Sequence, residues 1–100
     1  MNVLFSWLFS VEGRIHYYLG SSSVLQLSCF LNGFETALKL NDPSYEDVMY
    51  PGFQRYVEQF YLPQEHAMGW ARMIMAHASS DGEAMSKFFE LLHQYYDTLN

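Results

Sequence analysis

Cysteine is nearly absent from this sequence, with Cys29 as the one example in 100 residues. A lone cysteine excludes an internal disulfide, which is the usual staple of small secreted domains. This scarcity favours a reducing compartment, and we expect the protein in the cytoplasm. Because Cys29 lies between Ser28 and Phe30 in an apolar stretch, we expect a buried structural thiol rather than a nucleophile.

Lysine and arginine are also scarce: five of them stand against eleven aspartates and glutamates, and the net charge is −6. Nucleic-acid binding needs a basic surface, so this balance argues against a nucleic-acid partner. An acidic surface instead attracts a positively charged partner and accelerates its approach. Half of the residues are hydrophobic and 18% are aromatic, which excludes a disordered chain.

No apolar run reaches the ~20 residues that a membrane-spanning helix needs. The best candidate, MNVLFSWLFSV at residues 1–11, has no basic residue before it, and Glu12 and Arg14 follow closely. These flanks differ from those of a secretory signal. We therefore expect no membrane segment, and we interpret residues 2–10 as a short, buried first helix.

Alternating apolar and polar residues, typical of strands, are missing, and a helical period dominates instead. Four segments repeat apolar residues at spacings of three and four. The predicted core faces are Leu27, Leu31, Phe34 and Leu38; Phe53, Tyr56, Val57 and Phe60; Ala67, Trp70, Ala71, Ile74 and Ala78; and Met85, Phe88, Phe89, Leu92, Tyr96 and Leu99. The sequence predicts an all-α fold, a compact bundle of about five helices in a single domain over residues 1–100.

Turn and cap residues separate these predicted helices. The helix that carries Leu31 is expected to begin after a serine cap at residues 21–23 and to end at the NDP of residues 41–43. Gln26, Glu35 and Lys39 are predicted on its polar side. Residues 41–52, NDPSYEDVMYPG, are expected to form an exposed loop. Asp81 is the predicted cap of the last helix.

The stretch YLGSSSV, residues 18–24, raises the question of a phosphate-binding loop. Such a loop needs a second glycine and a lysine, because successive backbone amides and a cation hold the phosphate. Here no lysine or arginine follows before Lys39. We therefore interpret the stretch as a turn at Gly20 followed by a serine helix cap.

Metal and catalytic motifs are not evident among the four histidines, His16, His66, His77 and His93. Zinc hydrolases place two histidines one helical turn apart with a glutamate between them, and no such spacing occurs. The sequence therefore predicts no metal, no cofactor and no catalytic residue.

One alternative is enzymatic. Arg72 and His77, with four residues between them on a predicted helix, resemble the R-x4-6-H motif of HEPN-type ribonucleases. That resemblance implies a dimer in which the arginine and histidine act on an RNA backbone. The contrary interpretation is a surface arginine beside a half-buried histidine.

Carboxylates and tyrosines are interleaved over residues 42–65. Tyrosines bury a large area at low entropic cost and carboxylates pair with lysine and arginine, so the combination suits a protein-binding face. The contrary interpretation, a solvated loop beside core aromatics, stays open. The candidate partner-binding residues are Asp42, Tyr45, Glu46, Asp47, Tyr50, Glu58 and Glu65.

Four blocks together resemble the small helical immunity proteins of polymorphic bacterial toxins, such as those of contact-dependent growth inhibition. The blocks are YLG at 18–20, FLNGFETAL at 30–38, FQRYVEQFY at 53–61 and GWARMIMAHASSDGEAMSKFFELL at 69–92. The resemblance implies a non-enzymatic inhibitor that binds one cognate toxin domain one-to-one and occludes its active site or substrate path. A basic nuclease is the expected toxin, because an acidic inhibitor mimics nucleic-acid charge.

A third alternative is a self-associating structural or regulatory bundle. The sequence has more aromatic residues than a core of this size needs, and a homodimer would cover the surplus. The candidates for such a seam are Tyr17, Tyr18, Tyr95 and Tyr96.

Overall fold

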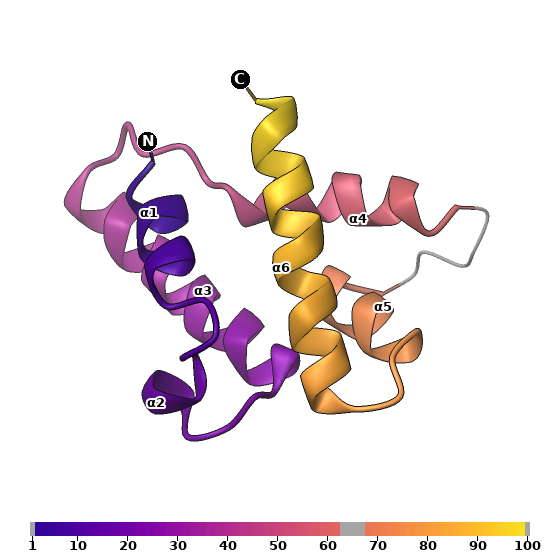
Figure 1. Ribbon diagram of the computed structural model, residues 1–100. Helices are drawn as coiled ribbons and strands as arrows, with labels where there is room; N and C mark the ends of the chain where they lie inside the picture. Colours follow the sequence, from indigo (N-terminus) through magenta and orange to yellow (C-terminus); the bar gives the residue numbers. More distant parts are fainter. Residues whose placement is uncertain (1, 63–67, 100) are drawn as a thin grey trace.

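The computed structural model describes residues 2–62 and 68–99, and all regular structure in this part of the chain is helical. The predicted all-α fold is confirmed, and Figure 1 shows how the helices are arranged. The elements are α1 (Val3–Ser10), α2 (His16–Leu19), α3 (Val24–Asn41), the π-helical turn η1 (Met49–Phe53), α4 (Gln54–Phe60), α5 (Trp70–Ala76) and α6 (Asp81–Thr98).

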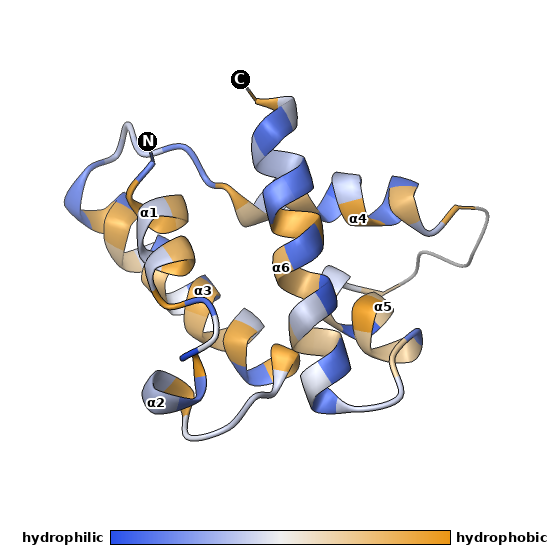
Figure 2. Ribbon diagram, viewed as in Figure 1, coloured by the Kyte–Doolittle hydropathy of each residue, from blue (hydrophilic) through white to orange (hydrophobic). Residues whose placement is uncertain are grey.

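The core lies between the two longest helices, α3 and α6, and is closed by the shorter ones (Figure 1). Its centre is aromatic: the rings of Phe53, Trp70 and Phe88 lie 5.1–5.6 Å apart, centroid to centroid, and come from η1, α5 and α6. Leu31 of α3 and Leu92 of α6 are also fully buried. Figure 2 shows hydrophobic residues concentrated on α1, α3 and α5, while both ends of α6 are hydrophilic.

The first helix packs into this core, as its sequence predicts. Leu4, Phe5 and Leu8 of α1 are buried, and the Asn2 side chain caps the helix by accepting a hydrogen bond from the Leu4 amide at 2.7 Å. Among the described helices, none combines the length and the hydrophobicity that crossing a bilayer requires.

Side-chain caps set the starts of the two long helices. Ser23 Oγ accepts from the Gln26 amide at 3.2 Å, and Gly20 adopts a left-handed turn with φ of 75°. YLGSSSV is therefore a turn and a cap, as expected. The predicted cap of α6 was off by one residue: Ser80 Oγ accepts from the Glu83 amide at 3.1 Å, and Asp81 is the first helical residue.

The loop after α3 departs most from expectation. Residues 41–52 are not wholly exposed, because Val48 and Met49 are buried and η1 begins within the segment. The helix α2 is an additional short element, and α5 ends at Ala76, before Ala78. Ala67, predicted on the α5 face, lies outside the described residues. Cys29 is exposed rather than buried, since it faces away from the Leu27–Leu31 side of α3.

Gly52 allows η1 to pack closely against α6. A methyl group at this position would collide with the Tyr95 hydroxyl and approach Tyr95 Cζ to 3.0 Å. Tyr95 has little freedom to retreat, because its ring contacts the rings of Phe5, Phe53 and Tyr56. The lack of a side chain at Gly52 therefore fixes how closely η1 approaches α6.

Replacing Gly52 tests this packing. We expect Gly52→Ala to lower the free energy of unfolding by about 1–3 kcal/mol, the usual cost of overpacking. Tyr95→Phe removes the colliding oxygen, so Gly52→Ala should cost clearly less in that background. Urea unfolding of the four proteins of this double-mutant cycle measures the difference. Equal costs in both backgrounds would contradict the proposed contact.

Candidate functional site

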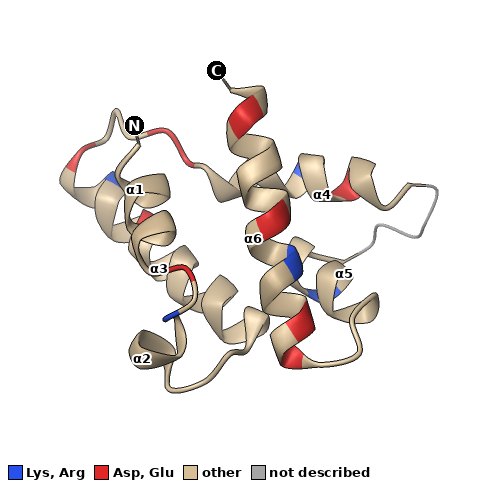
Figure 3. Ribbon diagram, in the orientation of Figure 1, with Lys and Arg blue, Asp and Glu red and all other residues tan. Residues whose placement is uncertain are grey.

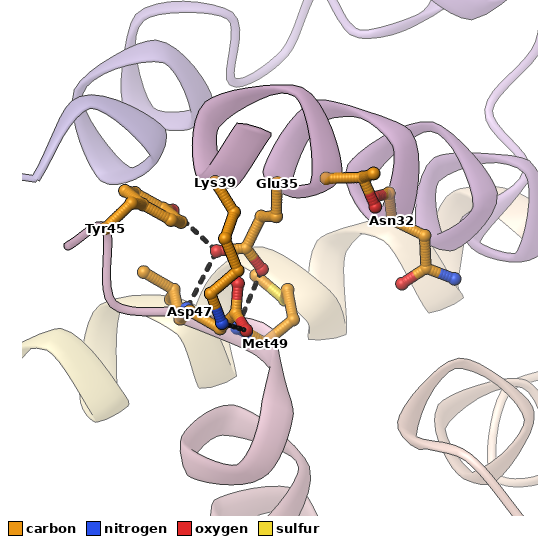
Figure 4. A network of polar contacts seen from close by, with 8 residues as sticks. Asn32, Glu35, Lys39, Tyr45, Asp47 and Met49 are labelled. Carbon is orange, nitrogen blue, oxygen red and sulfur yellow. Dashed lines mark hydrogen bonds and ion pairs between the residues drawn. The ribbon is translucent and has the colours of Figure 1, made fainter. Parts of the chain in front are cut away.

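A buried carboxylate joins α3 to the loop that follows it. The Glu35 side chain is only 7% exposed and points from α3 toward the loop (Figure 4). Its Oε2 accepts hydrogen bonds from the Tyr45 hydroxyl at 2.5 Å and from the Val48 amide at 2.8 Å. Its Oε1 accepts from the Met49 amide at 3.1 Å. All three partners are donors, as an acceptor-only carboxylate requires.

These three bonds fix the conformation of the acidic loop, which we define as residues 42–50. Val48 and Met49 bury their side chains in the core, so their amides have no water to bond and need the carboxylate. Tyr45 is half-buried against the same group. Burial, followed by its hydrogen bond to Glu35, raises the pKa of Tyr45, while a hydrogen bond with the Asn2 side chain acts in the opposite direction.

The outer side of the acidic loop is held by two exposed contacts. Lys39 Nζ pairs with Asp47 Oδ2 at 2.9 Å, which links the loop back to α3 (Figure 4). Asp42 Oδ1 accepts from the Ser44 hydroxyl at 2.7 Å and from its amide at 3.0 Å. These hydrogen bonds from Ser44 lower the pKa of Asp42. The loop is thus constrained on both sides while its carboxylates face solvent.

A hollow of about 330 Å³ lies between α3 and the acidic loop. Its lining mixes apolar and polar side chains from both elements: Asn32, Glu35, Thr36, Lys39, Leu40, Asp47 and Tyr50. Leu40 and Tyr50 are well exposed, so apolar surface and an aromatic ring lie beside the carboxylates. The hollow has room for one large side chain of a partner.

The structure brings together five of the seven predicted partner-binding residues. Asp42, Tyr45, Glu46, Asp47 and Tyr50 all belong to the acidic loop, and Figure 3 shows acidic residues along the segment that follows α3. Tyr45 points inward to Glu35, so it supports the surface rather than presenting a free phenol.

The other two predicted residues do not join this surface. Glu58 lies on α4, on the far side of α6 from the acidic loop in Figure 1. It accepts from Gln54 Nε2 at 2.8 Å, and Gln54 Oε1 in turn accepts from the Trp70 amide at 2.7 Å. Glu58 therefore supports the start of α5. Glu65 lies outside the described residues.

The prediction that Glu35 lies on the polar side of its helix is wrong. The buried row of α3 is Val24, Leu27, Leu31 and Glu35, at spacings of three, four and four, while Phe34 and Leu38 are only half-buried. The available signal was the position of Glu35 one turn after Leu31. Its charge nevertheless indicated the solvent side, because an unpaired buried carboxylate is costly.

The candidate ribonuclease pair lies elsewhere, with Arg72 on α5 and His77 at the C-cap of that helix. Arg72 and His77 are both exposed, so the prediction of a half-buried histidine is wrong. The His77 ring stacks on Tyr61 at 4.2 Å, and its Nδ1 lies 2.9 Å from the Met73 carbonyl oxygen. Across the described residues, no group of three or more histidine, cysteine, aspartate or glutamate side chains is arranged to hold a metal.

Known proteins offer no guide to this arrangement. No protein-family model matches the sequence, and neither a curated protein nor a solved structure is significantly similar to it.

Removing the buried carboxylate tests its role. We expect Glu35→Ala to lower the free energy of unfolding by roughly 2–6 kcal/mol, because two buried amides lose their acceptor at about 1–3 kcal/mol each. The matched control is Glu46→Ala, which removes an exposed carboxylate from the same loop and should change stability by less than about 0.5 kcal/mol. Urea unfolding measures both. Similar small effects would show that Glu35 is dispensable.

The phenol of Tyr45 predicts a pH dependence. Since its pKa is higher in the folded than in the unfolded chain, its stabilising effect is complete below about pH 10, the ordinary tyrosine value, and falls as the pH rises above it. The stability difference between the wild type and Tyr45→Phe should therefore shrink between about pH 9 and about pH 11. Urea unfolding across this range measures it. A constant difference would mean that Tyr45 ionises equally in both states.

Proposed function

We propose that this chain is an immunity protein that neutralises a cognate bacterial toxin domain in the cytoplasm. It binds the toxin one-to-one through the acidic loop and blocks the toxin's active site or substrate path, with no catalysis of its own. The observation that carries this proposal is the buried Glu35, which holds an otherwise solvent-facing acidic loop in one conformation.

A constrained loop favours tight binding. A flexible loop loses conformational freedom when it binds, and that entropic cost weakens the complex. Here the hydrogen bonds to Glu35 and the turn at Asp42 already restrict the loop in the free chain. The free energy that the exposed carboxylates gain on binding is therefore not offset by the cost of ordering the loop backbone.

Charge favours a basic partner and rapid capture. The chain carries a net charge of −6, and Glu46 and Asp42 are exposed on the acidic loop. Such a surface steers a positively charged protein and raises its association rate to as much as about 10⁸–10⁹ M⁻¹s⁻¹. A basic nuclease fits best, because its substrate groove is itself built to attract negative charge.

The hollow beside the loop supplies an anchor point. Interface energy concentrates where a large side chain fills a pocket with a polar rim around it. Leu40 and Tyr50 give this hollow an apolar wall, and Asp47 lies at its edge. An aromatic side chain of the toxin would fit this apolar wall, since Lys39 already pairs with the Asp47 carboxylate.

The first experiment identifies the partner and tests the loop. The tagged chain is purified at low salt from its own host, and a co-purifying basic domain is then expressed alone and with the chain. We expect toxicity that co-expression relieves, and an association rate that falls with salt as the Debye length shrinks from about 10 Å at 0.1 M to about 3 Å at 1 M.

Two charge variants assign the contact. Asp42→Asn with Glu46→Lys raises the charge by three while keeping an acceptor at residue 42 for the Ser44 turn. It should slow toxin association at least about tenfold. Asp81→Asn with Asp97→Lys makes the same charge change on α6 and should have a much smaller effect.

Two results would contradict the proposal. If both charge variants slow association equally, the acidic loop is not the contact. If the purified wild-type chain cleaves RNA and His77→Ala abolishes cleavage, the ribonuclease alternative replaces it.

A further inference from the structure

The hollow between α3 and the acidic loop has a buried hydrogen-bond acceptor in its wall. Glu35 lines the hollow and is 7% exposed. Its Oε2 accepts two hydrogen bonds, from the Tyr45 hydroxyl and the Val48 amide. Its Oε1 accepts one within the part of the chain that the structure describes, from the Met49 amide. Since each carboxylate oxygen can accept two hydrogen bonds, Glu35 has capacity for one more donor.

The two sides of the hollow each contribute an exposed apolar group. Leu40 of α3 is 81% exposed, and Tyr50 of the acidic loop is 46% exposed. This pair favours an aromatic occupant, because a ring buries a large area and packs against another ring at its face or edge. The volume of about 330 Å³ lies at the lower end of the range for ligand pockets, about 300–1,000 Å³, so the hollow suits a single side chain.

Charge determines which aromatic side chain suits the hollow. Carboxylates dominate its surroundings, since Glu35 and Asp47 line it. Asp42 and Glu46 lie on the same acidic loop. Lys39 is the one base among the described residues that line the hollow, and it is paired with Asp47 at 2.9 Å, as Figure 4 shows. These charges repel an acidic or phosphorylated occupant and attract a hydrogen-bond donor carried by a basic segment.

We propose that the hollow receives one tryptophan side chain from a basic segment of the partner. The indole ring packs between Leu40 and Tyr50, and the indole N–H donates to Glu35. Tryptophan fits best because its N–H only donates and a carboxylate only accepts. A tyrosine hydroxyl both donates and accepts, and phenylalanine has no donor for a buried oxygen. This inference rests on the proposed function, since it names the group of the toxin that this same site binds.

The tryptophan and the exposed carboxylates act at different stages of binding. Long-range charge accelerates the encounter and is weakened by salt, so the carboxylates of the acidic loop control association. A large side chain that fills a pocket acts only after the partners touch, so occupation of the hollow controls dissociation. A change in the hollow should therefore raise the dissociation rate and leave the association rate and its salt dependence unchanged.

A small-molecule probe tests the hollow without the toxin. NMR titration of the purified chain with N-acetyl-tryptophanamide should give saturable shifts of the Thr36, Leu40 and Tyr50 amides, with a Kd on the order of 1–10 mM. The matched probe is N-acetyl-1-methyl-tryptophanamide, in which a methyl group replaces the indole hydrogen. It should bind at least about fivefold more weakly, because it cannot donate to Glu35. Shifts that do not saturate at these residues, or equal binding of the two probes, would overturn the inference.

Two leucine variants assign binding to the hollow. Leu40→Ser removes one of its apolar sides, and Leu62→Ser makes the same change at an exposed leucine just after α4. Because both leucines are exposed, both variants should fold, which circular dichroism checks. We expect Leu40→Ser to weaken probe binding at least about threefold and to raise the dissociation rate of the toxin at least about tenfold. Leu62→Ser should match the wild type in both measurements.

The outcomes separate this inference from the proposed function. If the toxin is captured but leaves the Leu40→Ser variant as slowly as it leaves the wild type, the inference fails while the proposed function stands. If the probe binds in the hollow as expected but no toxin is captured, the proposed function fails and the hollow stands as a site for an indole donor.

Discussion

The bonds that Glu35 accepts from the acidic loop are the interaction on which the functional surface depends. The Glu35 carboxylate is buried because it belongs to the same buried row of α3 as Val24, Leu27 and Leu31. It then satisfies the amides of Val48 and Met49, whose side chains enter the core. The segment that follows α3 thus returns to the core within a few residues, and the carboxylates of the acidic loop in between stay exposed to solvent. Removing the acceptor would strand two buried donors, which proteins avoid.

The sequence predicts the helices well because their pattern is local. Leu27 and Leu31 on α3, and Phe88 and Leu92 on α6, follow the helical period and are buried. The predicted serine cap of α3 is confirmed at Ser23. Glu35 could not be recognised in the same way, because its donors lie 10 to 14 residues further along the chain. The sequence pattern of a helix indicates that a charged residue lies on the solvent side. Only a contact with a distant part of the chain places such a residue on the buried side instead.

The same contrast between local sequence patterns and tertiary contacts applies to the residues of the candidate site. The residues of the acidic loop were predicted together because they adjoin one another in sequence, whereas Glu58 lies on α4 and supports Gln54 instead. The exposed rings around Trp7 show the converse. Tyr18 could be singled out as a surplus aromatic, but Trp7 and Phe30 join it only through packing between three helices.

Amide hydrogen exchange at Val48 and Met49 tests the central claim most directly, because these are the two backbone groups that Glu35 holds. Native-state exchange followed by NMR should show both amides exchanging at least about a hundredfold more slowly than in an unstructured chain. The amide of the exposed residue Glu46 in the same loop should exchange faster than these two. Exchange of the Val48 and Met49 amides at the unprotected rate, in a chain whose α3 and α6 amides are protected, would contradict the account.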